Sequence, residues 1–248
     1  MPAKSVIQIK KLVKIFGKKD NPVKVLNSID LEIKSAEYII IFGPSGCGKS
    51  TLLNCIAGLE PPTDGEIVIR GEKITEENEA SIANYRRDKI GMVFQQFNLL
   101  KTMSVIDNVA LPQLLKGVKR KNRLARAKRL LEIFGLGNLA HRKPTELSGG
   151  QQQKIAIARS LVNNPWIMLI DEPTGNLDSK SADEVMELIR TLNRKSRRTI
   201  ILVTHNPDYV YYSHRVIYMK DGQITKIVEN RQEKFDEKDI EVQDIDKI

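Results

Sequence analysis

The sequence has little of what builds disulfide frameworks, metal clusters or membrane spans. Two cysteines, Cys47 and Cys55, occur in 248 residues, and their spacing matches no metal motif. The longest apolar runs, such as YIIIF (38–42) and WIMLI (166–170), fall far short of the roughly 18 to 20 residues that cross a bilayer. The first residues also lack the apolar segment of a secretory signal peptide. We therefore expect a chain of a reducing, cytosolic compartment that does not cross a membrane by itself.

Aromatic residues are scarce as well, at 5%, although the formal net charge is +9. Eight cations fall between Leu115 and Leu130 with no acid and no aromatic residue among them: Lys116, Lys119, Arg120, Lys121, Arg123, Arg126, Lys128 and Arg129. Proteins that bind single-stranded nucleic acid stack its bases on aromatic side chains. The segment therefore favours a solvated helix face over a nucleic-acid patch, with proximity to anionic lipid head groups as a further possibility.

The hydrophobic pattern predicts an α/β chain. Alternating residues in 5–13 and 25–33 predict a hairpin-like β layer, and 64–72 is a further strand bracketed by glycines. The short apolar runs 38–42, 166–170 and 199–204 are typical of strands buried on both faces. An amphipathic helix over 181–196 separates the last two strands. This βαβ unit implies a parallel sheet.

The chain is predicted to form one domain over 1–228. Residues 98–160 show helical periodicity without strand signals, and predict a helical subdomain inserted into a core formed by about 1–97 and 161–228. Residues 229–248 are charged, with eight acids and four bases, and predict a solvated tail.

A phosphate-binding loop follows the strand at 38–42. GPSGCGKST (43–51) fits the pattern G-x-x-x-x-G-K-[ST] and opens a helical pattern. Backbone N–H groups of such a loop point at phosphate oxygens, while Lys49 reaches the outer phosphates and the Ser50 hydroxyl ligates Mg²⁺. The predicted cofactors are thus a nucleoside triphosphate and Mg²⁺. Their predicted contacts are Gly43, Pro44, Ser45, Gly46, Cys47, Gly48, Lys49, Ser50 and Thr51.

Two carboxylates follow the apolar strand at 166–170. The C-terminal ends of parallel strands line the ligand crevice of such sheets, so Asp171 is expected beside the phosphate loop, where it holds Mg²⁺ through water. Glu172 is expected to polarise the water that attacks the γ-phosphate.

A second anion site is predicted at residues 147–151, LSGGQ, the signature segment. Ser148, Gly149 and Gly150 come directly before an apolar-periodic helix, whose first N–H groups lack intrahelical partners. One chain thus carries two phosphate-binding helix starts.

Together these motifs resemble the ATP-binding cassette (ABC) ATPases of membrane transporters, over residues 5–228, and the signature segment is the most specific element of the resemblance. It implies a phosphate-loop NTPase (RecA-like) core with an antiparallel N-terminal β layer and an inserted helical subdomain. It also implies two chains paired head to tail. Each ATP would then lie between one phosphate loop and the partner's Ser148, Gly149, Gly150 and Gln151.

The resemblance assigns four further positions. Phe16 would stack on adenine, where Tyr is the commoner residue. Gln95 would reach Mg²⁺ and the attacking water, although the adjacent Gln96 leaves the register open. Asp178, in GNLD, would touch the opposite subunit, and His205 would contact the γ-phosphate. With Lys49 and Glu172, Gln95 and His205 make up the implied catalytic set.

The implied function is ATP hydrolysis by one subunit of an ABC transporter. The resemblance implies a homodimer on the cytoplasmic face of the membrane, bound to an integral membrane permease and not to nucleic acid. Segments 85–100, 108–112 and 171–179 are similar to the branch that serves lipoprotein release, macrolide and peptide export, and cell division. The apolar segment 97–106 is typical of subdomain core, and the same residues would suit a patch that docks a short cytoplasmic helix of the permease.

The alternative is a soluble ABC ATPase that acts on nucleic acid or the ribosome. It is less favoured, because the chain has a single cassette and no heptads between its phosphate loop and its signature segment. A regulatory module without catalysis is disfavoured by the joint presence of Lys49, Asp171, Glu172 and His205.

Overall fold

The computed structural model of the chain describes residues 5–17 and 20–230. These residues form two compact units. Unit 1 contains the residues up to Arg86 and those from Thr199 onward, and unit 2 is Arg87–Arg198. No helix among the described residues has the length and apolar character needed to cross a membrane.

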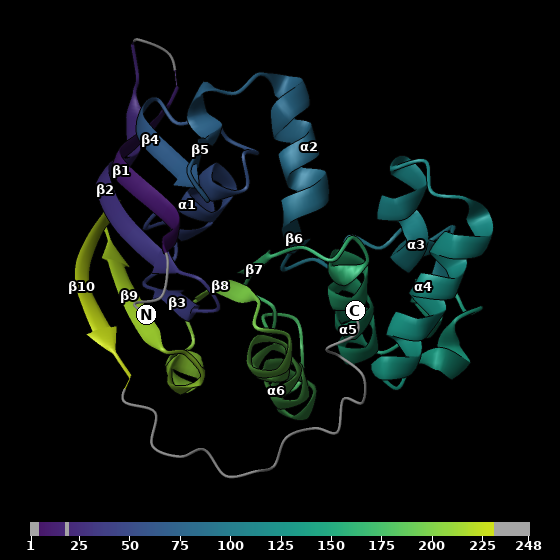
Figure 1. Cartoon of the computed structure of the whole chain (residues 1–248). Helices are drawn as coiled ribbons and strands as arrows, with labels where there is room; N and C mark the ends of the chain where they lie inside the picture. Colours follow the sequence, from purple (N-terminus) through teal and green to yellow (C-terminus); the bar gives the residue numbers. More distant parts are fainter. Residues whose placement is uncertain (1–4, 18–19, 231–248) are drawn as a thin grey trace. The chain divides into compact units, whose positions relative to one another are not determined.

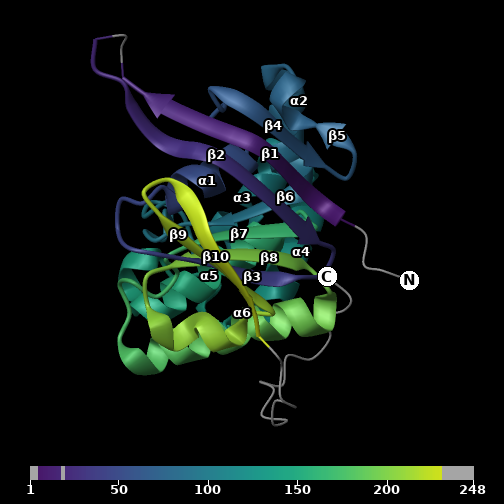
Figure 2. The same ribbon diagram turned by 90° about the vertical axis from the view of Figure 1, so that its left-hand side faces the viewer.

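The first sheet of unit 1 is antiparallel, with the strand order β2-β1-β4-β5. Its long strands β1 (Ser5–Phe16) and β2 (Val23–Lys34) form the predicted hairpin, seen as a ribbon in Figure 2. Strand β4 (Asp64–Ile69) pairs with β1, and the short β5 (Glu72–Lys73) with β4. Buried and exposed residues alternate along much of β2, as expected of strands with one face on a core.

The other strands of unit 1 are mainly parallel. Strand β3 (Tyr38–Phe42) lies between β8 (Thr199–Thr204) and β9 (Arg215–Lys220) and is parallel to both. Strand β10 (Gln223–Glu229) runs antiparallel to β9. All of β8 and most of β3 are buried, as their continuous apolar runs predict.

Helix α1 (Lys49–Ile56) packs between these strands in unit 1, on β2 and β8 (Figure 1). Its Leu52 and Leu53 side chains are fully buried. Helix α2 (Glu79–Lys89) has no buried residue, and the division of the chain into units falls within it, after Arg86. The 3₁₀ turns η1 (Ile74–Glu76) and η4 (Pro207–Tyr212) complete the unit.

Unit 2 is mostly helical and contains one parallel strand pair, β6 (Ile90–Val93) and β7 (Ile167–Asp171). Helix α5 is central, because it packs on α3, α4, α6 and β6. Its residues 155–158 are all fully buried. The helices are α3 (Val105–Leu115), α4 (Arg120–Ile133), α5 (Gly149–Leu161) and α6 (Ser179–Ser196), with 3₁₀ turns η2 (Gly137–Leu139) and η3 (Pro144–Glu146).

The predicted α/β class and the antiparallel N-terminal layer are confirmed. The pattern alone did not reveal α2, β6, β9 or β10. Residues 98–104 are not helical, since α3 begins at Val105 after its N-cap Ser104. The compact units divide the chain at other residues than the predicted 98–160 subdomain, which stays a prediction. Of the predicted 229–248 tail, residues 231–248 lie outside the described residues, and Glu229 ends β10.

Candidate functional site

The phosphate loop (43–51) leaves β3 and enters α1, as its sequence predicts. Leu52 N–H donates the first intrahelical hydrogen bond, to Gly48 O (2.9 Å), so the amides of 49–51 lie at the open end of the helix. Gly48 has φ of 100°, and a Cβ there would lie 2.7 Å from Val25 O. Glycine is therefore required at 48 by both backbone conformation and close packing.

The Lys49 ammonium lies folded against this loop. It is 6% exposed, and Nζ donates to Gly43 O and Pro44 O, each at 2.8 Å. Pro44, Ser45, Gly46 and Ser50 are exposed along the same loop. The loop thus presents a cation, helix-end amides and the Ser50 hydroxyl together, and these groups suit a polyphosphate and Mg²⁺.

His205 belongs to the same edge of unit 1. In the parallel pair β3–β8, Phe42 lies opposite Thr204. The phosphate loop follows Phe42 directly and His205 follows Thr204 directly, so both leave the same end of this strand pair. The His205 side chain is exposed, and the loop after it is fixed by Asn206 N–H, which donates to Thr204 Oγ1 (3.0 Å). Unit 1 therefore brings these two predicted parts of the site together.

Phe16 ends β1 in the other sheet of unit 1. The residue is 38% exposed, and the Lys14 ammonium lies over the ring, 4.7 Å from its centroid. Phe16 pairs with Val23, and Val25, two residues further along β2, packs on Gly48 of the phosphate loop. An exposed aromatic face with this connection to the loop suits a stacked base.

Gln95 is placed in unit 2, beside the loop that follows β7. Strands β6 and β7 are parallel with Val93 opposite Ile170, so Gln95 and the carboxylates leave the same strand ends. Gln95 Nε2 lies 3.1 Å from where a Gly175 Cβ would stand, and Gln95 O accepts from Asn176 Nδ2 (3.1 Å). These contacts belong to Gln95 and not to Gln96, and the assignment of Gln95 as the residue that reaches Mg²⁺ stays a prediction.

The carboxylates Asp171 and Glu172 end β7 and start the next turn. Both side chains are half-buried. Glu172 has φ of 47°, the left-handed region, and its carbonyl accepts from Gly175 N–H (3.2 Å). This turn gives the two successive residues different backbone directions, as a metal-holding Asp and a water-activating Glu require.

The signature segment forms the N-terminus of α5. Ser148 Oγ accepts from Gln151 N–H (3.3 Å), and Gln151 Oε1 accepts from Ser148 N–H (3.1 Å), a reciprocal capping box. Gln152 N–H makes the first intrahelical bond, to Ser148 O (2.9 Å), so the Gly149 and Gly150 amides precede it. The Ser148 hydroxyl proton and these amides form a donor set suited to phosphate oxygens.

Gly150 and Asp178, which are predicted to contact ATP or the second copy, also have structural roles within unit 2. A Cβ at Gly150 would lie 2.9 Å from both Cβ and Oγ of Ser181, so this glycine lets α5 approach α6 closely. Asp178 is the N-cap of α6, where Oδ1 accepts from Ser181 N–H (3.0 Å) and Oδ2 from Ser181 Oγ (2.8 Å). These hydrogen bonds lower the pKa of Asp178, chiefly the one from the backbone.

Arg159 of α5 is a residue that the sequence analysis missed. Its guanidinium donates to Asn98 O (2.6 Å) and Phe97 O (2.9 Å), just after Gln95. Burial lowers the pKa of Arg159. Through Arg159, the helix of the signature segment is tied to the segment that carries Gln95. No periodicity or motif could have paired two positions so far apart in the sequence.

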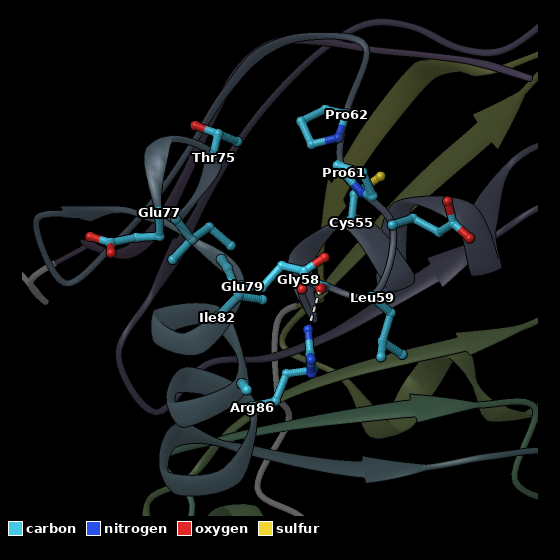
Figure 3. Close-up of a pocket in the computed structure, with 13 residues that line it drawn as sticks. Cys55, Gly58, Leu59, Pro61, Pro62, Thr75, Glu77, Glu79, Ile82 and Arg86 are labelled. Carbon is cyan, nitrogen blue, oxygen red and sulfur yellow. Dashed lines mark hydrogen bonds between the residues drawn. The ribbon is translucent and has the colours of Figure 1, made fainter.

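A cavity of about 520 Å³ in unit 1 was also missed (Figure 3). Leu59, Glu60, Ile82 and Arg86 are among its lining residues, and Arg86 Nη1 donates to Gly58 O (2.6 Å). Cys55 lies in its wall, and burial raises the pKa of that thiol to about 11. The cavity combines apolar walls with a charged rim, as surfaces that receive a peptide segment do.

The chain matches the family model described as "ABC transporter" over residues 26–175. The uncharacterized ABC transporter ATP-binding protein MJ1508 of Methanocaldococcus jannaschii is 46% identical over 223 residues, 90% of this chain and 99% of that protein. The macrolide export ATP-binding/permease protein MacB of Aggregatibacter actinomycetemcomitans is 44% identical over 230 residues, 93% of this chain but 36% of that protein.

A solved structure agrees with this similarity. The ATP-binding cassette MJ0796 of Methanocaldococcus jannaschii, in a dimeric post-hydrolysis state bound to ADP and Pi, matches with a TM-score of 0.84 and 39% identity, covering 92% of this chain and 100% of that one. The identity and coverage are high enough to decide the family as well as the fold. The chain belongs to the ATP-binding proteins of ABC transporters.

Proposed function

We propose that the chain hydrolyses ATP as one of two identical subunits that drive a membrane permease. The observation that carries this proposal is that the chain holds two separate phosphate-binding helix starts, the phosphate loop at α1 and the signature segment at α5. A chain with both elements is suited to sharing each ATP with a second copy. The dimer of MJ0796 bound to ADP and Pi supports this arrangement.

Within each site, the residues divide the work by their chemistry. Lys49 and the loop amides bind the phosphates, and Ser50, Asp171 and Gln95 would hold Mg²⁺, which neutralises charge on the phosphates. Glu172 orients and deprotonates the attacking water, and His205 donates to the γ-phosphate. Ser148, Gly149, Gly150 and Gln151 of the second copy close the site, Asp178 lies at the contact between copies, and Phe16 holds the adenine.

The membrane partner is supported by the name of a relative. MacB is named an ATP-binding/permease protein, and this chain covers 36% of its length, so the cassette and the permease are joined there in one chain. We place this chain at the cytoplasmic face of the membrane, bound to a permease of the branch that serves lipoprotein release, macrolide and peptide export, and cell division.

Two surfaces of the chain are suited to contact the permease. In the predicted docking segment 97–106, Leu100 is 44% exposed whereas Val105 is buried. The part of the segment that precedes α3 could therefore contact the permease. The cavity lined by Leu59 and Ile82 in unit 1 offers a concave receptor for a short helix.

Co-purification from gently solubilised native membranes tests this function. The Glu172→Gln chain with ATP should hold the closed dimer and bring down an integral membrane protein in near-equal amount. The Lys49→Ala chain, which binds ATP poorly, is the matched control and should form no closed dimer. Recovery of ribosomes or nucleic acid instead of a membrane protein would overturn the proposal and favour the soluble alternative.

A further inference from the structure

Helices α3 and α4 are joined by an exposed segment that mixes leucines with cations. We call residues 114–121 the basic tip. Leu114 is 42% and Leu115 76% exposed, and the four cations Lys116, Lys119, Arg120 and Lys121 are exposed beside them. Figure 1 shows α3 and α4 side by side in unit 2, and the two helices pack on each other.

The leucines of the basic tip do not belong to the core of unit 2. The buried residues of the two helices lie further from the tip, among them Val109 of α3 and Leu130 of α4. Leu115 is exposed over most of its surface, so its burial contributes little to the fold. With the adjacent Leu114 it forms a small apolar patch, and contiguous apolar patches are typical of protein or membrane contacts.

Most of the positive charge on the tip is not neutralised. Lys116 pairs with Asp88 (2.8 Å), whereas Lys119, Arg120 and Lys121 pair with no carboxylate in the part of the chain that the structure describes. Arg129 continues the positive surface along α4. Burial is the main cause that lowers the pKa of the neighbouring Arg126, and the positive charge of Arg129 lowers it further. The net potential of the tip is therefore positive.

We infer that the basic tip binds the surface of an anionic lipid bilayer, with Leu114 and Leu115 inserted among the head groups and the cations on lipid phosphates. Apolar side chains flanked by Lys and Arg are the composition that an anionic membrane interface accepts. A nucleic acid would use the cations but has no place for the leucines, and the tip offers no aromatic ring for base stacking. This contact does not depend on the nucleotide site or on a permease.

Flotation with protein-free vesicles tests the inference on the full chain. Vesicles of phosphatidylcholine with about one third phosphatidylglycerol should bind the protein, and pure phosphatidylcholine vesicles should not. Replacement of Lys119, Arg120 and Lys121 by Gln should lower the partition constant roughly a hundredfold, at about fivefold per cation. The pair Leu114→Ser and Leu115→Ser, with every cation kept, should lower it about tenfold.

The matched control removes similar groups elsewhere. Lys24→Gln, Lys226→Gln and Ile227→Gln change two exposed cations and an exposed apolar residue (Ile227 is 46% exposed) of unit 1, and should leave vesicle binding unchanged. Unaltered ATP binding and thermal unfolding would show that each variant is folded. If the leucine variant binds the vesicles as wild type does, or if a single-stranded oligonucleotide binds the tip more tightly than the vesicles do, the inference is wrong.

Discussion

At the scale of single residues, several side chains of the candidate site have a structural task beside the chemical one proposed for them. Ser148 closes the capping box of α5, and Asp178 caps α6. Gly150 allows the two helices to approach each other at Ser181. Loss of activity on mutating these residues would therefore not by itself identify contact with ATP. Measurements of folding stability separate the two tasks.

We expect Gly150→Ala to destabilise the chain. The new Cβ would stand 2.9 Å from two atoms of Ser181, and overpacking of this kind costs about 1–3 kcal/mol, which exceeds the ~1 kcal/mol of helix propensity that alanine gains over all but the lowest part of that range. Urea unfolding measures the change. Gly149→Ala is the matched control and should cost less, since the only tight contact of its Cβ is with the end of a side chain, Leu177 Cδ2 at 3.2 Å, whereas Asn176 O and Phe97 Cζ lie at the ordinary distances of 3.5 and 3.7 Å.

A second substitution shows whether the cause is steric. Adding Ser181→Gly to Gly150→Ala removes the colliding atoms, so the two changes together should cost less than the sum of their separate costs. Strict additivity in this double-mutant cycle would contradict the close contact.

At the scale of elements, α5 organises unit 2, since it packs on α3, α4, α6 and β6 and starts at the signature segment. Arg159 extends this role to the segment after Gln95 through hydrogen bonds to the backbone at 97 and 98. A movement of α5 would therefore displace the Gln95 segment, and the reverse holds too. Lys154 adds a tie from α5 to α6 through Glu184 (2.7 Å).

Arg159→Ala should separate positioning from nucleotide binding. It leaves the half-buried carbonyl of Phe97 and the exposed carbonyl of Asn98 without a charged donor, and we expect about 1 kcal/mol less stability. The kcat for ATP hydrolysis should fall, whereas ATP affinity should stay near wild type, because Lys49 and the phosphate loop are untouched. Arg142→Ala, at an exposed arginine, is the control. An equal loss of ATP affinity would contradict this separation.

The ion pairs at Asp88 predict a pH dependence. A hydrogen bond from Arg87 and a second, weaker contribution from the hydrogen bond of Lys116 lower the pKa of Asp88 to about 2, below the ordinary value near 3.9. The stabilisation is therefore complete above about pH 4 and is lost as the pH falls through about 2. Because the Asp88 side chain is 29% exposed, we expect less than about 1 kcal/mol.

Unfolding of wild type and Asp88→Asn at successive pH values measures this contribution. The difference in unfolding free energy should be constant near neutral pH and should shrink toward zero below about pH 3. A difference that persists unchanged at the lowest pH would show that the carboxylate charge is not its source.

The elements that could be predicted are those with local signals. The alternation in β1 and β2, the apolar runs of β3, β7 and β8, and the phosphate loop each lie within a short window of sequence. Helix α2 buries no residue and so shows no apolar stripe. The Arg159 hydrogen bonds and the contact between Gly150 and Ser181 join distant residues, and only the folded chain reveals them.

At the scale of the whole molecule, each compact unit carries a different half of the proposed machinery. Unit 1 holds the phosphate loop, Phe16 and His205, and unit 2 holds Gln95, the carboxylates and the signature segment. The family places the chain among ABC transporter ATP-binding proteins, and a relative is solved as a dimer. The central claim is that a complete site needs the phosphate loop of one copy and the signature segment of another.

Mixing two inactive variants tests that claim most directly. Lys49→Ala removes phosphate binding, and Ser148→Arg blocks the signature segment, so each variant alone should lack ATPase activity. In an equal mixture, half of the dimers would contain one chain of each kind and one intact shared site, which restores about a quarter of wild-type activity per chain. A mixture that stays inactive although both variants fold and form mixed dimers would contradict the claim.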